Sequence, residues 1–478
     1  MLFNSLSFLL FLPIVFTLYW WINKRSLQLQ NFLLLLASYF FYACWDWRFL
    51  FLLLFSTALD YFTGIKMEEA KNKGNKKLWF WLSVIVNLGF LGVFKYYNFF
   101  ADSFATALSG LGIQANFWTL KVILPVGISF YTFHGLSYVI DIYKGRIQAE
   151  RNIITYSLFV GYFPLLVAGP IERATHLLPQ IKKKRHFDYS MAIDGVHQII
   201  WGLFKKVVIA DNCALYANAI FDHYESMNSV SLFLGAIYFA FQIYGDFSGY
   251  SDIALGTSKL FGVDLLRNFN YPYFSRDIAE FWRRWHISLS SWFRDYLYIP
   301  LGGSQGGMML KIRNTFIIFL VSGFWHGANW TFIVWGALHA VYFLPLLITQ
   351  NNRNNLDIVA KGKTLPTLKE FASMLLTFGL TTLAWIFFRA KTVSEASVYI
   401  KNMLSFNFDG KIQFLDFDRY AIEFLLILGL FIGIEWSSRE KEHPISGRFT
   451  TLKALAILTA ILILGVFSSP SNFIYFQF

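Results

Sequence analysis

Long apolar segments alternate with short polar ones along almost the whole chain. Many have about the 17–25 residues that a helix needs to span a bilayer. Others are short or interrupted by glycine or proline, and these fit re-entrant helices. The pattern predicts an all-α polytopic integral membrane protein with about 11 to 13 transmembrane and re-entrant helices. The segments are 3–22, 31–45, 48–65, 79–100, 119–143, 153–169, 192–221, 229–247, 314–349 (in two pieces), 371–388, 420–436 and 452–468.

Lysine and arginine gather in the short polar segments, and such clusters predict the cytoplasmic side of a membrane protein. Counting spans between the clusters places the N-terminus outside, together with the almost uncharged segment 101–118. Lys24 and Arg25 follow the first apolar segment instead of preceding it, so we expect a retained helix and not a signal peptide. The clusters are Lys24/Arg25, 66–77, Lys144/Arg146, 182–185, 351–363 and 437–443.

Composition supports a membrane protein. The 478 residues are 56% hydrophobic and only 15% charged, whereas about a quarter of the residues in soluble domains are charged. The net charge of +12 lies mainly in short loops, so we expect it to set topology and not to bind nucleic acid. The two cysteines provide no disulfide framework and no thiolate metal site.

The region 245–313 differs from the rest. GDFSGYSD (245–252) comes first, and a stretch dense in aromatic residues and arginine follows. Guanidinium groups within a membrane need partners or water. We therefore expect short amphipathic and re-entrant helices on the cytoplasmic side.

His326 lies in GFWHGANWTFIVWGALHA (323–340), between apolar residues. A titratable side chain at membrane depth is costly, which favours a function. Desolvation keeps an imidazole neutral, the form that a general base needs. The alternative is a buried histidine that holds two helices together through one hydrogen bond.

A second histidine, His286, follows Arg283, Arg284 and Trp285. The cations disfavour its protonation, and their guanidinium groups suit an anionic ligand such as the phosphates of a coenzyme. The alternative is an interfacial helix whose basic face meets anionic lipid head groups.

Other polar residues give weaker signals. Asp246, near a predicted membrane boundary, either orients a histidine, caps a helix or pairs structurally, and we favour the last two. A metal site at His286, His326 and His339 is not expected. At about 100° per residue, the last two fall on nearly opposite faces of one helix, and no HxxxH spacing occurs.

Taken together, the motifs resemble those of bacterial membrane-bound O-acyltransferases of the alginate O-acetyltransferase type, over nearly the whole chain. They are PVGISFYTFHGLSYVIDIYKG (125–145), FPLLVAGPIERATHLLPQI (163–181), GLFKKVVIADN (202–212), YGDFSGYSDIALGTSKLFG (244–262), FNYPYFSRDIAEFWRRWHISLSSWFRDYLYIPLGG (269–303), GFWHGANWTFIVWGALHA (323–340), AWIFFRA (384–390) and the tail FIYFQF.

The resemblance implies a ring of helices around a tunnel that joins a cytoplasmic funnel to an outer cavity, in the bacterial inner membrane. It implies an acetyl group taken from acetyl-CoA, with no bound cofactor, and an acceptor hydroxyl on an exported polysaccharide. A periplasmic or extracellular SGNH-hydrolase-like partner protein is also implied. One acyltransferase domain would then fill 1–478, with N-terminal helices (1–118), a catalytic core (119–349) and C-terminal helices (350–478).

The resemblance makes His326 and His286 the catalytic positions. We expect His326 to deprotonate the acceptor hydroxyl, while Arg283, Arg284, Trp285 and His286 bind the donor or stabilise an oxyanion. Asp246, Trp325 and Asn329 are expected to support them. Peptidoglycan acylation, D-alanyl transfer and a transporter or flippase of an acylated or lipid-linked sugar remain alternatives, the last with His326 as a proton relay.

Overall fold

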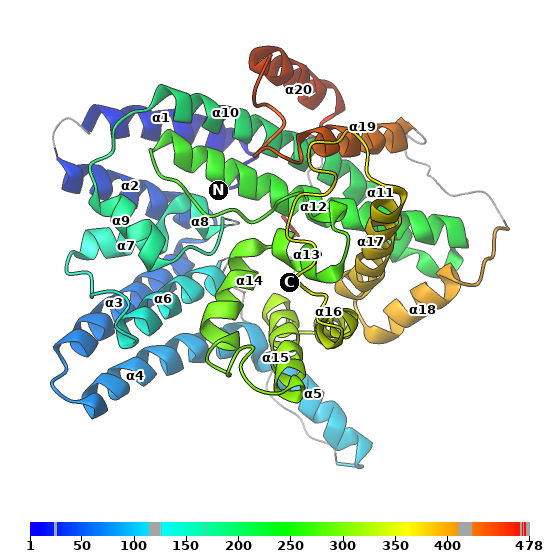
Figure 1. Cartoon of the computed structure of the whole chain (residues 1–478). Helices are drawn as coiled ribbons and strands as arrows, with labels where there is room; N and C mark the ends of the chain where they lie inside the picture. The colour runs from blue at the N-terminus through cyan, green and yellow to red at the C-terminus, as the bar shows by residue number, and fades with distance from the viewer. Residues whose placement is uncertain are drawn as a thin grey trace. The chain divides into compact units, whose positions relative to one another are not determined.

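The computed structural model describes residues 1–22, 26–113, 125, 127–167, 169–409, 423–468, 471, 473 and 474. The basic pair Lys24/Arg25, the start of the predicted segment 119–143 and the last four residues of the tail lie outside these ranges. Within them the secondary structure is helical and contains no strand, as the apolar pattern predicts (Figure 1).

Six helices are long and apolar enough to cross a membrane, by length and composition, in the part of the chain that is described. Five shorter apolar helices of 10–17 residues accompany them. The chain is therefore an all-α, multi-pass membrane protein. The break predicted within 314–349 lies at Gly327–Asn329, between two of the six long helices.

The helices form two compact units, and each is described by itself. Unit 1 comprises Met1–Gly195 and Ala254–Leu266. Its helices are α1 (Leu6–Ile22), α2 (Leu27–Ala43), α3 (Trp47–Glu69), α4 (Lys73–Leu91), the π-helical turn η1 (Gly92–Tyr96), α5 (Tyr97–Gly110), α6 (Ile128–Tyr143), α7 (Ile153–Gly161), α8 (Phe163–Leu166) and α9 (Ala174–Lys182).

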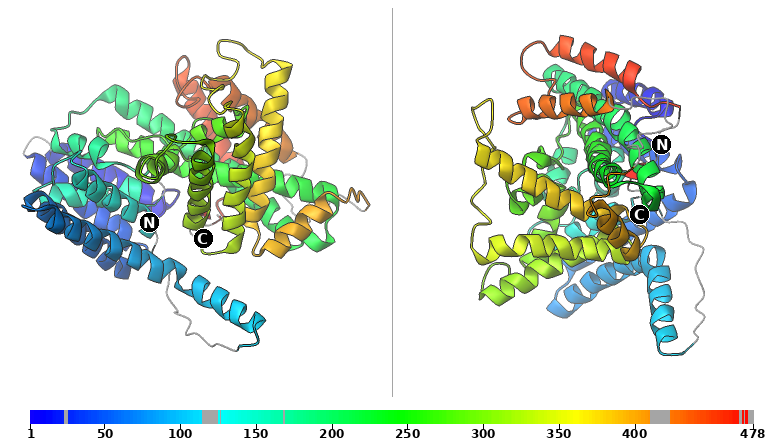
Figure 2. Two further views of the ribbon diagram at one scale, coloured as in Figure 1. Left: turned by 60° about the horizontal axis from the view of Figure 1, so that its bottom comes forward. Right: turned by 90° about the vertical axis from the view of Figure 1, so that its right-hand side faces the viewer.

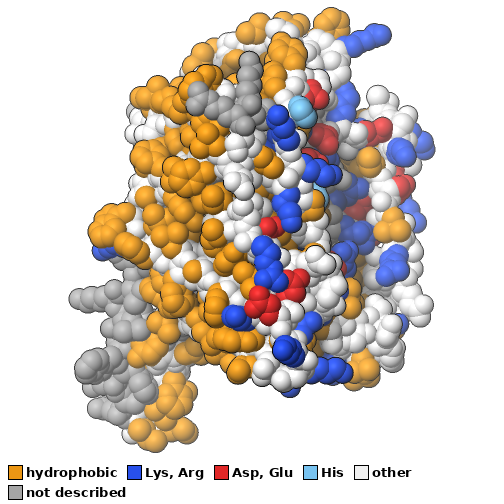
Figure 3. All heavy atoms as spheres, turned by 90° about the vertical axis from the view of Figure 1, so that its left-hand side faces the viewer, with side chains coloured by type: hydrophobic (Ala, Val, Ile, Leu, Met, Phe, Trp, Pro, Cys, Tyr) orange, Lys and Arg blue, Asp and Glu red, His pale blue; other side chains and the backbone are white. Residues whose placement is uncertain are grey.

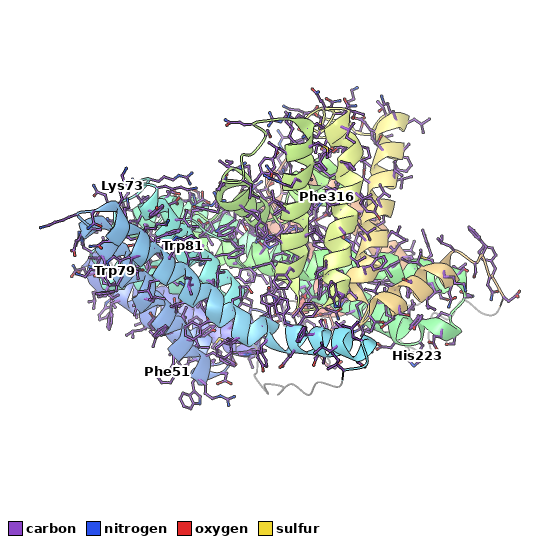
Figure 4. All side chains as sticks on the ribbon, turned by 90° about the horizontal axis from the view of Figure 1, so that it is seen from below. Phe51, Lys73, Trp79, Trp81, His223 and Phe316 are labelled. Carbon is purple, nitrogen blue, oxygen red and sulfur yellow. The ribbon has the colours of Figure 1, made fainter. Side chains whose placement is uncertain are left out.

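An antiparallel hairpin of α3 and α4 packs against α6 in unit 1. Asp46 and Asn72 begin its two helices, because each side chain accepts a hydrogen bond from a backbone N–H of the first turn. Phe51 and Lys73 consequently lie at opposite ends of the hairpin in Figure 4. Between the helices, the buried Asp60 carboxylate accepts hydrogen bonds from Ser83 (2.6 Å) and Asn87 (2.7 Å).

Hydrophobic side chains cover most of the face shown in Figure 3, and charged side chains gather along one margin of it. In unit 1, Leu36, Phe40, Phe51 and Phe55 are among the exposed apolar residues. An exposed apolar surface of this kind is unfavourable in water and suits contact with lipid acyl chains.

Unit 2 comprises Val196–Ile253 and Arg267–Phe478. The helices α10 (Tyr189–Phe204) and α12 (Ser229–Leu260) belong partly to each unit. The remaining elements of unit 2 are the π-helical turn η2 (Lys205–Ala210), α11 (Asp211–Asp222), the 3₁₀ turns η3 (Tyr224–Ser226) and η4 (Pro272–Phe274), α13 (Ile278–Arg284), α14 (Ile287–Phe293), the π-helical turn η5 (Arg294–Tyr298), α15 (Met308–His326), α16 (Trp330–Ile348), α17 (Leu368–Arg389), α18 (Val393–Met403), α19 (Glu423–Ser438) and α20 (Thr450–Leu464).

Three long helices of unit 2, α15, α16 and α17, lie side by side (Figure 2). The short helices α13 and α14 pack beside them, α13 against α16. The predicted region 245–313 thus contains short helices in its second half, whereas its first residues belong to a long helix, and the re-entrant, cytoplasmic placement stays a prediction.

The helix α12 corrects the predicted segment 229–247, because it continues to Leu260 through GDFSGYSD. Its small residues explain the continuation. A Cβ atom at Gly249 would lie 2.8 Å from the carbonyl oxygen of Gly202, so the two backbones nearly touch. Asp246 and Asp252 therefore lie in the interior of this helix and not at its N-terminal cap. Each is paired with a lysine within unit 2.

Candidate active site around two histidines

A close crossing of α15 and α16 places His326. A Cβ atom at Gly323 would lie 2.2 Å from the carbonyl oxygen of Phe332, and one at Gly336 would lie 2.3 Å from that of Phe319. Only glycine permits such an approach. His326 is the last residue of α15, directly after this crossing.

Asn329 begins α16. Its side-chain oxygen accepts a hydrogen bond from the backbone N–H of Thr331 (3.0 Å), and its amide nitrogen donates one to the carbonyl of Lys391 (2.9 Å). These bonds fix the turn that follows His326. The contribution of Asn329 is thus to the backbone at the site, and a direct role in chemistry stays a prediction.

Aromatic rings surround His326, which is buried. Its ring meets those of Trp325, Trp335 and Phe388 edge to face, at centroid distances of 4.9, 5.1 and 5.3 Å. Close packing of this kind removes water from the imidazole and restricts its rotation. Trp325 is thus in direct contact with His326, and its supporting role in catalysis stays a prediction.

His286 adopts an unusual backbone conformation, with φ 43° and ψ 54°, and begins α14. Non-glycine residues rarely occupy this left-handed region, and such strain often occurs at functional sites. Asn268 holds the turn, because it accepts hydrogen bonds from the Ile287 N–H (2.9 Å) and the Ser288 hydroxyl (2.6 Å).

The ring of His286 is also buried, with Phe247 edge-on at 4.7 Å. Burial lowers the pKa of His286 to about 3, so the ring is neutral at physiological pH. The sequence predicted this direction but ascribed it to the neighbouring arginines. The cause is desolvation. The centroids of His286 and His326 are 6.4 Å apart, so the fold brings the two predicted catalytic histidines together.

Arg283 and Arg284 are committed to protein groups. Arg283 donates hydrogen bonds to the carbonyls of Asn352 (2.9 Å) and Asn355 (2.8 Å). Arg284 pairs with Glu280 (2.8 Å) and donates to the carbonyl of Asp357 (3.0 Å). The two guanidinium groups thus fasten the loop after α16 to α13, and their binding of a donor stays a prediction.

Trp285, the third predicted donor-binding residue, is packed inside unit 2. It stacks on Phe281 at 5.5 Å and lies 5.0 Å from Trp385. These contacts fix the position of the backbone that carries His286.

Asp246 pairs structurally, which is one of the two roles that the sequence favoured. The buried ammonium of Lys206 lies 2.8 Å from both Asp246 and Asp211, and it donates to the carbonyl of Ser471 (3.0 Å). Asp246 also accepts the backbone N–H of Ile474 (2.6 Å). Sequence reasoning missed Lys206, although two lysines within the apolar stretch GLFKKVVIADN were a signal.

A cavity of about 260 Å³ lies beside the site. Aromatic and polar side chains line it, and Ser322 among them is one helical turn before His326 on α15. Sequence reasoning missed this cavity because its lining comes from segments far apart in the chain. The lining residues are Trp282, Ser290, Phe293, Arg294, Tyr298, Ser304, Thr315, Ile318, Phe319, Ser322, Phe343, Leu347, Asn352 and Arg353.

In the described residues there is no group of three or more His, Cys, Asp or Glu side chains that could hold a metal ion. The predicted geometry of two of these histidines is wrong. His326 and His339 are not on one helix, because Gly327–Asn329 separates α15 from α16. Both rings contact Trp335, at 5.1 and 4.9 Å.

The family model of the membrane-bound O-acyltransferases matches residues 146–388, a range that contains both histidines and the cavity. The chain belongs to this family. It is thus an O-acyltransferase, and the resemblance noted in its motifs is confirmed.

Relatives of this acyltransferase carry related names. It is 38% identical to a probable alginate O-acetylase AlgI of Pseudomonas syringae pv. tomato, over 94% of this chain and 85% of the relative. It is 42% identical to a probable alginate O-acetylase AlgI of Pseudomonas aeruginosa, over 85% and 75%. It is 37% identical to a peptidoglycan O-acetyltransferase of Helicobacter pylori, over 85% and 80%.

Proposed function

We propose that this acyltransferase takes an acetyl group from acetyl-CoA on the cytoplasmic side and delivers it across the membrane to a hydroxyl of an exported polysaccharide, directly or through a partner protein. The observation that carries the proposal is the buried pair His286 and His326 beside a cavity, within a multi-pass membrane protein. The names of the relatives support acetyl as the acyl group.

His326 acts as the general base in this proposal. It removes the proton from the acceptor hydroxyl, whose oxygen attacks the thioester carbonyl. The tetrahedral intermediate then collapses, the carbon–sulfur bond breaks, and the thiolate takes the proton back from His326. The neutral, desolvated imidazole accepts the first proton, the imidazolium so formed donates it to the thiolate, and the surrounding rings keep water from competing with the acceptor.

His286 stabilises the oxyanion of that intermediate. A neutral imidazole donates one hydrogen bond, and burial keeps His286 neutral. In this proposal the left-handed backbone at this position orients the ring toward the intermediate. Arg283 and Arg284 contribute by holding the loop 352–357 in place.

The cavity receives the donor. Trp282, Phe319 and Phe343 provide apolar surface for the acyl-carrying arm of the coenzyme. Arg294 and Arg353 line the same cavity and suit the phosphates at the other end. Because Ser322 is one turn from His326, a donor in this cavity has its thioester end close to the base.

The direction of transfer follows from the proposed topology. With the N-terminus outside, the basic segments 66–77 and 351–363 face the cytoplasm, where acetyl-CoA is made available. In this topology, in a bacterial inner membrane, the acceptor and an SGNH-hydrolase-like partner protein are on the periplasmic or extracellular side.

Acetyl transfer in proteoliposomes tests the proposal. Purified protein is given acetyl-CoA labelled in the acetyl group, and release of free CoA and label on an added polysaccharide are measured. We expect His326→Ala to lower the rate at least about 100-fold. His223→Ala, at the exposed end of α11 (Figure 4), is the matched control and should leave it unchanged. Equal rates for His326→Ala and the wild type would refute the role of His326 as general base. If the wild type neither hydrolyses acetyl-CoA nor transfers its acetyl group, acetyl-CoA is not the donor.

A further inference from the structure

His339 is a third buried histidine, to which the proposed mechanism gives no part. It lies in the middle of α16 and is completely buried. Its ring stacks on Phe281 at 6.1 Å with an interplanar angle of 3°, and on Phe319 at 6.3 Å. Trp335 meets it edge to face at 4.9 Å. These contacts hold the plane of the ring fixed.

Trp282 determines which nitrogen of His339 carries the proton. The indole N–H of Trp282 donates a hydrogen bond to Nδ1 of His339 (3.2 Å), so Nδ1 is the acceptor and the proton of the neutral ring lies on Nε2. Trp282 also lines the cavity beside the site. One side chain therefore forms a wall of the cavity and sets the tautomer of the histidine behind it.

Two buried N–H donors in this place lack a protein acceptor. Among the described residues, neither Nε2 of His339 nor Nε1 of Trp335 has a hydrogen-bond partner. An unpaired buried donor costs free energy, and such groups usually have a ligand or water as their partner. Trp335 is in contact with both His339 and His326, and the cavity residue Trp282 is in contact with both Trp335 and His339.

We propose that Nε2–H of His339 and Nε1–H of Trp335 bind carbonyl oxygens of a pantetheine arm, the amide-containing chain that carries the thioester of the donor. This inference rests on the proposed function and specifies its donor site. The arm enters through the cavity, whose wall at Trp282 is in contact with both His339 and Trp335. The ligand class follows from the chemistry, because a pantetheine thioester has carbonyl acceptors along an otherwise flexible, mostly apolar chain.

Phe343 and Phe319 connect this donor site to the cavity. Both line the cavity, Phe319 stacks on His339, and Phe343 is one helical turn after His339 on α16. The same aromatic layer therefore contacts the histidine on one side and the cavity on the other. Only one layer of side chains therefore separates a pantetheine arm in the cavity from the N–H groups of His339 and Trp335.

Two acyl donors of different length test whether these two N–H groups bind the pantetheine arm. Acetyl-CoA carries the pantetheine arm, whereas ethyl thioacetate has the same thioester without the arm. We expect His339→Phe, which keeps the ring stacking and removes the N–H, to raise KM for acetyl-CoA about 5- to 15-fold. The same variant should react with ethyl thioacetate at the wild-type rate. A merely structural role would lower activity toward both donors equally.

Two further variants complete the experiment. Trp335→Phe should raise KM for acetyl-CoA by a larger factor than it lowers the rate with ethyl thioacetate, which changes only because Trp335 also packs against His326. Trp282→Phe keeps an aromatic wall in the cavity but removes the hydrogen bond to His339, so it should raise KM for acetyl-CoA by a larger factor alone than when it is added to His339→Phe. An unchanged KM for acetyl-CoA in His339→Phe, or an equal loss with both donors, overturns the inference while leaving the proposed function intact. A wild type that accepts neither thioester overturns both.

Discussion

The ring centroids of His286 and His326 are 6.4 Å apart, although the two residues come from different helices. Different backbone features position them. His326 ends α15 at a glycine crossing. His286 begins α14 in a left-handed conformation. At this distance both rings can contact one small reacting group. Transfer of an acyl group from a sulfur to an oxygen needs such an arrangement.

The conformation of His286 predicts a difference between two substitutions. Asparagine tolerates the left-handed region, so His286→Asn should fold with a melting temperature close to that of the wild type and still lose about 100- to 1000-fold in transfer rate. His286→Ala should lose the same activity and also melt earlier, because alanine pays about 1–2 kcal/mol in this region. Thermal unfolding in detergent and the proteoliposome assay measure the two effects. Equal activity of His286→Asn and the wild type would contradict a chemical role.

The crossing of α15 and α16 predicts that neither of its glycines accepts a methyl group. Gly323→Ala and Gly336→Ala each place a Cβ atom within 2.3 Å of a backbone oxygen, which a side-chain rotation cannot relieve. We expect a loss of at least about 2–3 kcal/mol in stability and little folded protein. Gly379→Ala on α17 is the control, because a Cβ atom there meets nothing within 4 Å. It should leave stability unchanged or improve it. Yield of monodisperse protein and melting temperature distinguish the cases.

The buried cluster around Lys206 predicts a stability effect that a second change repairs. Lys206→Met leaves the carboxylates of Asp211 and Asp246 together without a cation, at a cost of about 3–5 kcal/mol. Adding Asp211→Asn and Asp246→Asn removes both charges and should restore most of the melting temperature. Lys259→Met provides the control, since its partner Asp194 is 40% exposed and such pairs contribute under about 1 kcal/mol. A triple variant no more stable than Lys206→Met would argue against charge as the cause.

The pair of His176 and Glu172 predicts a pH dependence in unit 1. The hydrogen bond from His176 to the buried Glu172 (2.8 Å) raises the pKa of His176 above its ordinary value of 6.5. A raised histidine pKa adds stability that is fully present below pH 6.5 and is lost as the pH rises through the folded-state pKa. The effect is modest, below about 1 kcal/mol, because the His176 side chain is 36% exposed.

The measurement for this pair is the melting temperature between pH 5.5 and 8.5 with His176→Gln beside the wild type. We expect the fall in melting temperature over this range to be smaller in His176→Gln. A steeper fall in the variant would show that the stabilising charge lies elsewhere.

The sequence predicted the features that depend on neighbouring residues. Apolar length gave the helices and a division of 314–349 into two pieces, although not its position after His326, and the cost of a titratable group in a membrane singled out His326. Motif resemblance gave the family. These signals are local, or come from many local matches along the chain, so they can be read without knowing which segments meet in space.

The features that the sequence did not predict depend on contacts between distant segments. Nothing next to Arg283 indicates that carbonyls of Asn352 and Asn355 will occupy its guanidinium group. Asp246 looked like a boundary residue because its partner Lys206 is on another helix, and the tautomer of His339 depends on Trp282 from α13. Polar residues in apolar stretches showed that partners must exist, but not which ones.

The π-helical turn Lys205–Ala210 makes the fold sensitive to deletion of a single residue at this point of the chain. A π turn contains one residue more than an α-helical turn, and here it presents Lys205 to Asp252 and Lys206 to Asp246. Loss of a single residue from this turn would restore a regular helix and rotate α11 by about 100° relative to α10. It would carry one lysine away from its carboxylate and expose a charge to the apolar interior. The number of residues in this turn therefore matters to the fold as much as the identity of its two lysines.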